Sequence, residues 1–293
     1  MNTLKHFLIS GKEFDYIGVK TFFHNFFAKI VIKHYLCKNF HKKDTLLIKN
    51  SNYIMKKTVL SLLLMVVAST AFAQDIQLHY DFGRNLYPNE EAGRPKMTAT
   101  FEQFKADDAG SWFYFVDMDF NCQGAVGAYT EVSREFNLCN KGFAAHIEYD
   151  GGLNLGTTFQ HSTLIGPAWN GHNDDFSTTY SVQLMYKQYY KNNSHRAYAS
   201  AQLTGVWSTT FANKACTFSG FIDLWRGEKF NNHGQLVLLS EPQFWYNLNT
   251  IPSMKKVNLS IGTEVEISNN FVFNSYNDKS FFINPTIALK YAF

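Results

Sequence analysis

The stretch SFFINPTIALKYAF, from Ser280 to Phe293, decides the fold of this chain. Its side chains alternate between two faces, as they do in a β-strand. The apolar face consists of Phe281, Ile283, Ile287, Leu289, Tyr291 and Phe293. The opposite face is small or polar and consists of Asn284, Thr286, Ala288 and Lys290. Because chain ends fray unless they are tied down, a terminal strand this regular predicts that the C-terminus is part of a sheet.

Further strands are predicted upstream, each bounded by Gly, Asn, Asp or Pro. With the last one they make twelve, namely residues 76–83, 97–107, 111–120, 125–137, 143–150, 156–165, 176–190, 195–209, 215–226, 234–248, 256–268 and 280–293. Several are longer than the five or six residues that are usual in soluble sheets. They match the roughly 9–11 residues with which a tilted strand crosses a bilayer. The chain is therefore predicted to be all-β.

Charged side chains keep to one phase of these strands. In residues 111–120, Asp117 and Asp119 oppose an apolar phase that includes Trp112 and Phe120. A soluble sandwich could show the same split, but its edge strands would need protection. A closed transmembrane barrel has no edges, and its charged phase faces the lumen because a Lys or Arg facing mid-bilayer lipid costs about 2–4 kcal/mol.

Aromatic residues make up 17% of the chain, and many lie near predicted strand ends. Girdles of this kind mark the two interfaces of a membrane barrel. The candidates are Trp112, Tyr149, Tyr190, Trp207, Trp225, Trp245, Tyr246, Tyr291 and Phe293. We therefore expect a closed antiparallel transmembrane β-barrel of about 12 strands.

The first 73 residues differ from the rest in charge. They hold 11 of the 27 Lys and Arg residues but 3 of the 24 Asp and Glu residues, which leaves 16 basic and 21 acidic residues in positions 74–293. The positive charge of the whole chain is therefore no evidence for nucleic-acid binding.

Residues 55–73 have the basic start, short apolar core and Ala-Phe-Ala site of a secretory signal peptide, so the barrel is expected to span residues 74–293. Residues 1–54 are interpreted as an N-terminal extension from a misassigned start site. The alternative is a basic cytoplasmic arm before an uncleaved anchor.

Connection lengths support a barrel in which long loops alternate with short turns. Residues 84–96 form a long polar connection, whereas only residues 108–110 follow the next strand. Residues 166–175, GPAWNGHNDD, are long at the end where short turns are expected, which suggests that the strand at 156–165 is misplaced. Pro242 and Pro285 indicate bulges or strand ends.

No metal or cofactor is expected. Cys122, Cys139 and Cys216 are an odd number and exclude a fully paired disulfide framework, and the histidines show no metal-ligand spacing. Asp174 and Asp175 could bind Ca²⁺, but they lack an EF-hand spacing and are interpreted as part of a solvated loop.

The chain resembles bacterial outer-membrane barrels, whose last strand typically ends in Phe or Trp, as ALKYAF does here. This resemblance implies that Phe293 is the address that the barrel-assembly machinery reads. The strand count and the segments SWFYFVDMDF and GAYTEVSREFN also look like the nucleoside-specific channel-forming (Tsx-like) family, in an uncharacterised Bacteroides-type branch. That resemblance implies a monomeric barrel that passes nucleosides.

The charged phase supplies the candidate residues for lining the pore and binding solute. They are Asp81, Glu102, Phe113, Asp117, Asp119, Glu131, Glu135, His146, Glu148, Lys187, Arg196, Asp223, Glu264 and Glu266. Acidic and basic walls that face each other would orient dipolar solutes and select ions. Alternatively, these charges only pair with each other and hold the shape of the barrel.

Three lumen-phase aromatic side chains, Phe113, Phe115 and Phe221, would stack on a flat nucleobase or would simply pack inside the barrel. His146 and Glu148 lie on one face and are expected to form a hydrogen bond. Arg134 breaks the phase, which a bulge or an interfacial position would accommodate.

We expect a channel in the outer membrane of a Gram-negative cell for passive diffusion of small polar solutes, with nucleosides as the favoured solute. One alternative is a non-conducting barrel whose outer loops bind a partner or a surface, and another is a soluble periplasmic barrel or sandwich. An enzyme is not expected, because Ser and His occur without a nucleophile motif. The expected partners are membrane lipid, the assembly machinery and a small polar solute.

Overall fold

The computed structural model of the chain describes residues 74–293, except 122–123, 140, 155–156, 229–235 and 273–278. The predicted extension, residues 1–54, and the predicted signal peptide, residues 55–73, lie outside the described residues. Cys122 lies outside them as well.

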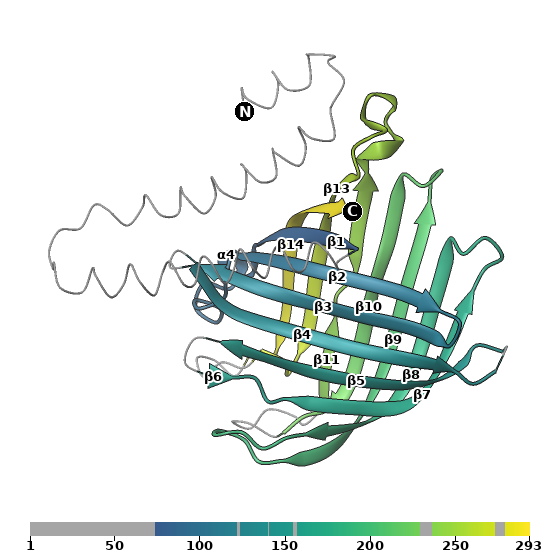
Figure 1. Cartoon of the computed structure of the whole chain (residues 1–293). Coiled ribbons are helices and arrows are strands. Elements are labelled where there is room, and N and C mark those ends of the chain that lie inside the picture. The colour runs from purple at the N-terminus through teal and green to yellow at the C-terminus, as the bar shows by residue number, and fades with distance from the viewer. Residues whose placement is uncertain (1–73, 122–123, 140, 155–156, 229–235, 273–278) are drawn as a thin grey trace, which may run out of the picture.

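The described chain is almost entirely antiparallel sheet (Figure 1). Its strands are β1 (Asp75–Asp81), β2 (Met97–Asp107), β3 (Gly110–Asn121), β4 (Gly124–Asn137), β5 (Phe143–Asn154), β6 (Thr157–Thr158), β7 (Ser162–His172), β8 (Thr178–Tyr189), β9 (Tyr198–Phe211), β10 (Cys216–Arg226), β11 (Leu236–Ser240), β12 (Gln243–Asn247), β13 (Leu259–Asn269) and β14 (Phe281–Ala292). The short helical turns are α4 (Gly83–Leu86), η1 (Leu248–Thr250) and η2 (Pro252–Met254).

The sheet closes on itself as a barrel of twelve strands. β14 pairs with β1 along the whole of β1, and β10 pairs with β9 on one side and with β11 and β12 on the other. β11 and β12 together form one barrel strand, and β6 lies outside the barrel, paired only with β5. The backbone N–H of Phe293 donates to the carbonyl of Gln74 at 3.0 Å, which ties the C-terminus to the start of β1. The predicted fold class and the terminal strand are confirmed.

The strand predicted at residues 156–165 is wrong in position, because β7 covers Ser162–His172. It pairs with β5 from Ser162 opposite Asp150 to Trp169 opposite Phe143. Gly166 and Pro167 look like turn residues in the sequence but lie in mid-strand. A Cβ at Gly166 would collide with the carbonyl of Leu184, so glycine is needed there for close strand packing.

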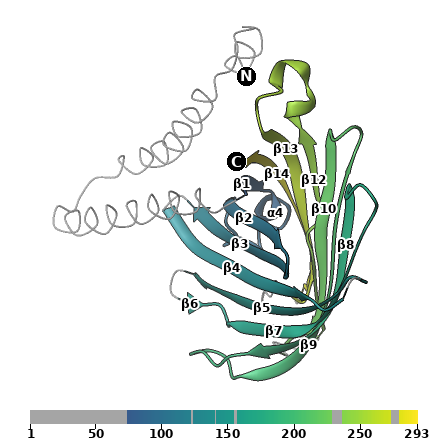
Figure 2. The same cartoon turned by 45° about the vertical axis from the view of Figure 1, so that its right-hand side comes forward.

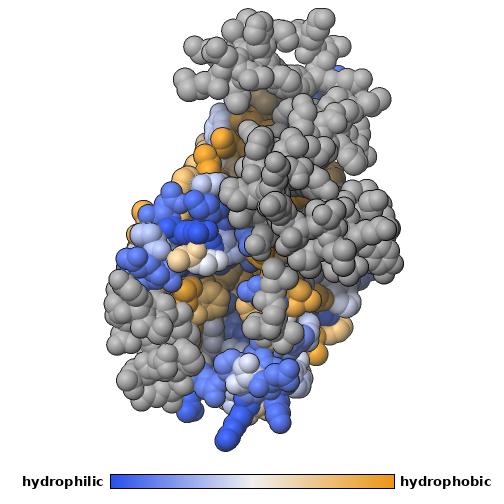
Figure 3. Space-filling model, turned by 90° about the vertical axis from the view of Figure 1, so that its left-hand side faces the viewer, coloured by the Kyte–Doolittle hydropathy of each residue, from blue (hydrophilic) through white to orange (hydrophobic). Residues whose placement is uncertain are grey.

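The two ends of the barrel carry different connections. The start of β1, the C-terminus and the connection between β12 and β13 lie at one end, the termini end, where that connection projects at the top of Figures 1 and 2. The longer connections, including residues 82–96 with α4, lie at the other end, the loop end (Figure 1). Figure 3 looks onto the side where α4 lies and shows hydrophilic residues gathered there, with hydrophobic residues beside them.

The outward phase of the strands is apolar and exposed. The exposed fraction lies between 40% and 59% for Ile165, Val182, Leu184, Leu203, Ile222, Ile261, Ile283 and Ile287. Exposure of such an apolar belt to water would be unfavourable, whereas contact with lipid tails is favourable. A closed barrel also leaves no backbone group unpaired at a sheet edge. The chain is therefore an outer-membrane β-barrel. Among the described residues, no helix is long and apolar enough to cross a bilayer.

Aromatic side chains form an outward band near the termini end. The band includes Trp112, Trp169, Tyr180, Trp207, Tyr246 and Tyr291. The girdle prediction is wrong for two residues. The register places Trp225 opposite Gln202 and Trp245 opposite Gly262, and both tryptophans belong to the lumen phase. Their hydrogen-bonding and charged partners in the lumen explain why aromatic residues near strand ends did not all face lipid.

Arg134 faces outward within this aromatic band. Its guanidinium lies 5.1 Å from the Trp112 ring centroid and 4.9 Å from that of Phe136, and it forms an ion pair with Asp107 at 2.8 Å. The interfacial position is therefore the correct explanation for its broken phase, because the nearest register shift lies at Asp119 and Phe120.

Candidate functional site in the barrel lumen

The lumen phase brings most of the predicted site residues together. Register pairs such as Glu102 with Phe115 and Glu131 with Asp150 place their side chains on the same inner wall. The predicted residues that face the lumen are Asp81, Glu102, Phe113, Asp117, Asp119, Glu131, Glu135, His146, Glu148, Lys187, Asp223, Glu264 and Glu266. Arg196 does not join them, because β9 begins at Tyr198 and Arg196 is exposed in the connection before it.

Residues 82–96 fold back onto the lumen wall at the loop end. Arg94 of this connection forms ion pairs with Asp81 at 3.0 Å, Glu91 at 3.5 Å and Glu266 at 2.8 Å. Asn284 of β14 donates to Glu91 at 2.9 Å and to Glu266 at 3.2 Å. We call these five residues the Arg94 cluster. It joins the loop to β1, which directly precedes it, and to β13 and β14, which are distant in sequence, and so it narrows the mouth of the barrel.

Glu91 of the Arg94 cluster is 3% exposed. Burial raises the pKa of its carboxyl above the ordinary value, and the nearby Arg94 guanidinium offsets only part of this effect. Glu91 Oε2 and Asn284 Oδ1 are both buried without a hydrogen-bond partner. Both lie beside Gly83, where an added Cβ would be 2.7 Å and 2.6 Å from them. A Cβ at residue 83 would therefore push against the buried ends of these two side chains.

A second set of polar contacts follows the wall formed by β12, β13, β14, β1, β2 and β3. His79 contacts Gln77 at 3.0 Å, and Thr100 donates to Asp117. Lys290 lies 4.3 Å from the ring centroid of Trp245, which is fully buried. This side of the lumen is closely packed, because Phe282 and Asn284 are fully buried as well.

A third set lies across β5, β8, β9 and β10. Lys187 forms an ion pair with Asp150 at 3.0 Å and donates to Gln202 at 2.8 Å. Its ammonium lies 5.2 Å from the ring centroids of both Tyr189 and Trp225. The carboxylate that Lys187 contacts is Asp150 of β5, which was not among the predicted acidic residues facing it.

His146 bridges two carboxylates of the same region. Its Nδ1 lies 3.1 Å from Glu135 and its Nε2 lies 3.1 Å from Glu148. Glu135 also accepts a hydrogen bond from Asn170 at 2.6 Å. The contact between His146 and Glu148 agrees with the predicted hydrogen bond.

Aromatic rings form a row along the inner wall. Phe113 and Phe115 are 6.0 Å apart between ring centroids, Phe115 and Tyr129 are 6.0 Å apart, and Tyr129 and Phe159 are 5.7 Å apart. Such a row offers successive apolar faces to a planar solute that moves along the strand direction.

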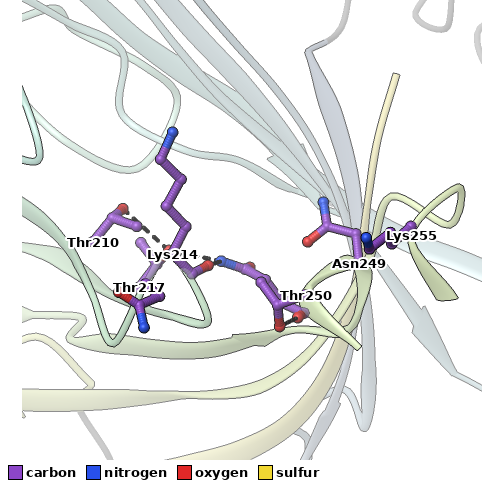
Figure 4. Close-up of a pocket in the computed structure, with 8 residues that line it drawn as sticks. Thr210, Lys214, Thr217, Asn249, Thr250 and Lys255 are labelled. Carbon is purple, nitrogen blue, oxygen red and sulfur yellow. Dashed lines mark hydrogen bonds between the residues drawn. The ribbon is translucent and has the colours of Figure 1, made fainter. Parts of the chain in front are cut away.

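A polar pocket lies at the termini end between the turn after β9 and the connection after β12. Its volume is about 570 Å³, and Figure 4 shows Lys214 and Lys255 on different sides of it. Asn247 donates to the carbonyl of Lys214 at 2.7 Å, and Thr210 contacts Thr217 at 3.3 Å. This end of the lumen is therefore lined by amide, hydroxyl and ammonium groups.

Several lumen residues were missed as candidate site residues. Arg94 and Glu91 belong to a connection, and the sequence gives no signal that a polar loop folds inward. Asp75 lies one residue before the predicted start of its strand, although its pairing with Glu102 in register makes it a lumen residue. Asp150 and Lys290 lie in the polar phase of predicted strands, so alternation alone would have found them.

Comparisons with solved structures found several similar chains, of which the NanC porin supports the barrel fold. The NanC porin structure has a TM-score of 0.50 and 11% sequence identity, and the alignment covers 75% of this chain and 99% of that chain. LpxR from Salmonella typhimurium has a TM-score of 0.40 and 7% identity, with coverage of 75% and 99%. OccAB2 from Acinetobacter baumannii has a TM-score of 0.37 and 10% identity, with coverage of 68% and 55%.

No curated protein matches the sequence. A family model described as a domain of unknown function, DUF5020, matches residues 73–293, which is the whole barrel. The chain therefore belongs to the DUF5020 family.

Proposed function

We propose that the protein is an outer-membrane channel for passive diffusion of small polar solutes. The observation that carries this proposal is the lumen phase, which presents charged and polar side chains around the wall of a closed barrel. Carboxylates outnumber basic groups on it, with Lys187 and Lys290 among the few cations of the wall. Rings of acidic side chains favour cations and dipolar solutes in pores.

Nucleosides are the solutes that we favour within this class. The row from Phe113 to Phe159 suits a planar base, and carboxylates such as Asp117 and Glu131 would accept hydrogen bonds from sugar hydroxyls. Binding has to be weak, because a solute that binds tightly would block the pore. Transport is then driven only by the concentration gradient.

The proposal also assigns roles in export and in barrel assembly to the two ends of the chain. Residues 55–73 would direct the chain to the export machinery, and Phe293 would present the terminal strand to the barrel-assembly machinery. Phe293 suits this role because half of its surface is exposed on the outward face. We expect the assembled protein to be a monomer and to have no enzymatic activity.

One observation favours a second candidate function. The Arg94 cluster narrows the loop end, and Trp245, Phe282 and Asn284 fill the lumen on one side. If the remaining lumen is too narrow for solutes, the protein is instead a non-conducting barrel whose loops bind a partner or a surface.

Liposome swelling separates these proposals. The full chain, purified from outer membranes in detergent, is inserted into liposomes and exposed to uridine, adenosine or neutral sugars of similar mass. The channel proposal predicts swelling with all of them, and the nucleoside proposal predicts faster swelling with nucleosides. Equal rates would remove the nucleoside proposal alone, whereas no swelling beyond that of empty liposomes would favour the non-conducting barrel.

A further inference from the structure

Three carboxylates converge on one point of the lumen wall. Glu131 lies on β4, and Glu148 and Asp150 lie on β5. Glu131 is directly opposite Asp150 in the register, and Glu148 is two residues away on the same face. One oxygen of each carboxylate lies within 4.8 Å of those of the other two. We call these residues the β4–β5 carboxylate cluster.

The hydrogen bonds around the cluster leave its carboxylates only partly satisfied. Tyr129 donates to Glu131 Oε1 at 2.9 Å, and His146 contacts Glu148 Oε2 at 3.1 Å. Asp150 Oδ2 accepts from Ser162 at 2.8 Å and pairs with Lys187. Asp150 Oδ1, by contrast, is buried without any hydrogen-bond partner, on a residue that is 3% exposed. A buried, unpartnered carboxylate oxygen is unfavourable unless a cation or a donor reaches it.

The charge in this region is also unbalanced. Asp223 of β10 is a further lumen carboxylate, and its negative charge is repelled by those of Glu148 and Asp150. The nearest ammonium is that of Lys187, and it is already held by Asp150, Gln202 and the rings of Tyr189 and Trp225. Lys187 carries one positive charge, and His146 is shared between Glu148 and Glu135, so these two groups cannot neutralise the three carboxylates of the cluster. Their mutual repulsion makes an added cation favourable.

We propose that Glu131, Glu148 and Asp150 bind a divalent cation of the Ca²⁺ class. Carboxylate oxygens are the preferred ligands of this hard cation, which holds oxygens at about 2.3–2.6 Å, so that two ligands can be up to roughly 5 Å apart. One oxygen of each carboxylate lies within 4.8 Å of the others, which is compatible with this span. Water from the lumen would complete the coordination shell. Ca²⁺ fits better than Mg²⁺, because Mg²⁺ demands near-ideal octahedral geometry and usually takes one or two carboxylates.

The bound ion would have two consequences for the barrel. It would cross-link β4 to β5 at mid-barrel, and it would neutralise part of the acidic wall. This inference does not depend on conduction, since a non-conducting barrel would bind the ion equally well.

Terbium luminescence tests the proposal directly. Tb³⁺ replaces Ca²⁺ at oxygen sites, and Tyr129, whose hydroxyl contacts Glu131, would sensitise its emission when excited. The full-length protein in detergent is expected to give a saturable emission signal that Ca²⁺ displaces at lower concentration than Mg²⁺. Glu131→Gln keeps an oxygen that can accept from Tyr129 but removes the charge, and it should weaken Tb³⁺ binding at least tenfold.

Glu264→Gln is the matched control, because it removes a lumen carboxylate of β13 that lies outside the cluster; it should bind Tb³⁺ as the wild type does. Glu148→Gln provides a second variant if Glu131→Gln fails to fold, with folding checked by the heat-dependent gel mobility of the barrel. Absence of a saturable signal in the wild type, or equal affinities in the wild type and the cluster variants, would overturn the proposal.

Discussion

The Arg94 cluster and the β4–β5 carboxylate cluster solve the same problem in different ways. Each gathers three carboxylates on the lumen side of the barrel. In the first, the chain supplies a guanidinium whose rigid fork of donors serves all three carboxylates at once. In the second, the nearby cation is an ammonium that pairs with one carboxylate. The difference teaches that carboxylates inside a barrel need counter-charge, and that the solvent has to supply what the chain does not.

The largest expected effect is the loss of Arg94. Arg94→Ala leaves Asp81, Glu91 and Glu266 mostly buried without their cation, and breaking a buried ion pair costs about 3–5 kcal/mol. We expect lower stability in urea unfolding of the detergent-solubilised protein and faster protease cleavage within residues 82–96. Arg84→Ala, an exposed change in α4 of the same loop, is the control. Equal stabilities of the two variants would show that the cluster does not hold the loop.

Gly83→Ala should displace the loop without removing a charge. The added methyl group would meet Asn284 and Glu91, and overpacking of this kind costs about 1–3 kcal/mol. The expected result is a lower thermal midpoint together with faster cleavage of residues 82–96. Gly93→Ala is the matched control in the same loop, because a Cβ at Gly93 meets no atom within 4 Å. A midpoint for Gly83→Ala as high as that of Gly93→Ala would contradict the packing described for the loop.

Lys187→Met should increase the difference in counter-charge between the two clusters. The change keeps much of the side-chain length but removes the ammonium beside Asp150, so the β4–β5 carboxylate cluster becomes more negative. We expect Tb³⁺ affinity to rise about tenfold, which corresponds to 1.4 kcal/mol. Titration of the emission signal measures this change. An unchanged or weaker affinity would mean that the cluster does not bind the cation.

The smallest expected effect is a pH dependence at Glu91. Because burial raises the pKa of this carboxyl, ionisation of Glu91 destabilises the folded protein relative to the unfolded chain. This destabilisation is absent below the unfolded-state pKa of about 4.3 and is present in full above the raised folded-state pKa. Glu91→Gln removes it, so the thermal midpoint of the variant relative to the wild type should be higher at pH 8 than at pH 4. The opposite sign would show that Arg94 stabilises the ionised form by more than burial destabilises it.

Much of the fold could be predicted because a barrel strand shows a simple alternation. The register of β14 with β13 and β1 has the apolar and polar faces that the sequence of residues 280–293 indicates. The same alternation identified Asp117, Glu131 and Glu264 as lumen residues. The largest error in strand position occurs where turn-like residues occupy a strand, as Gly166 and Pro167 do in β7.

The contacts within the lumen could not be predicted in the same way. Arg94 and Glu266 are 172 residues apart, and only the closed barrel with its inward loop brings them together. Trp225 and Trp245 were assigned to lipid because composition near strand ends does not reveal phase. Arg196 was assigned to a strand that begins two residues later. These errors concern loop direction and strand ends, which depend on tertiary packing rather than on local pattern.

Single-channel recording in a planar bilayer under a KCl gradient tests the central claim most directly. The account predicts discrete openings of the full-length protein with a reversal potential that favours cations, because the lumen carries an excess of carboxylates. Insertion of the protein without openings, or openings that favour anions, would contradict it.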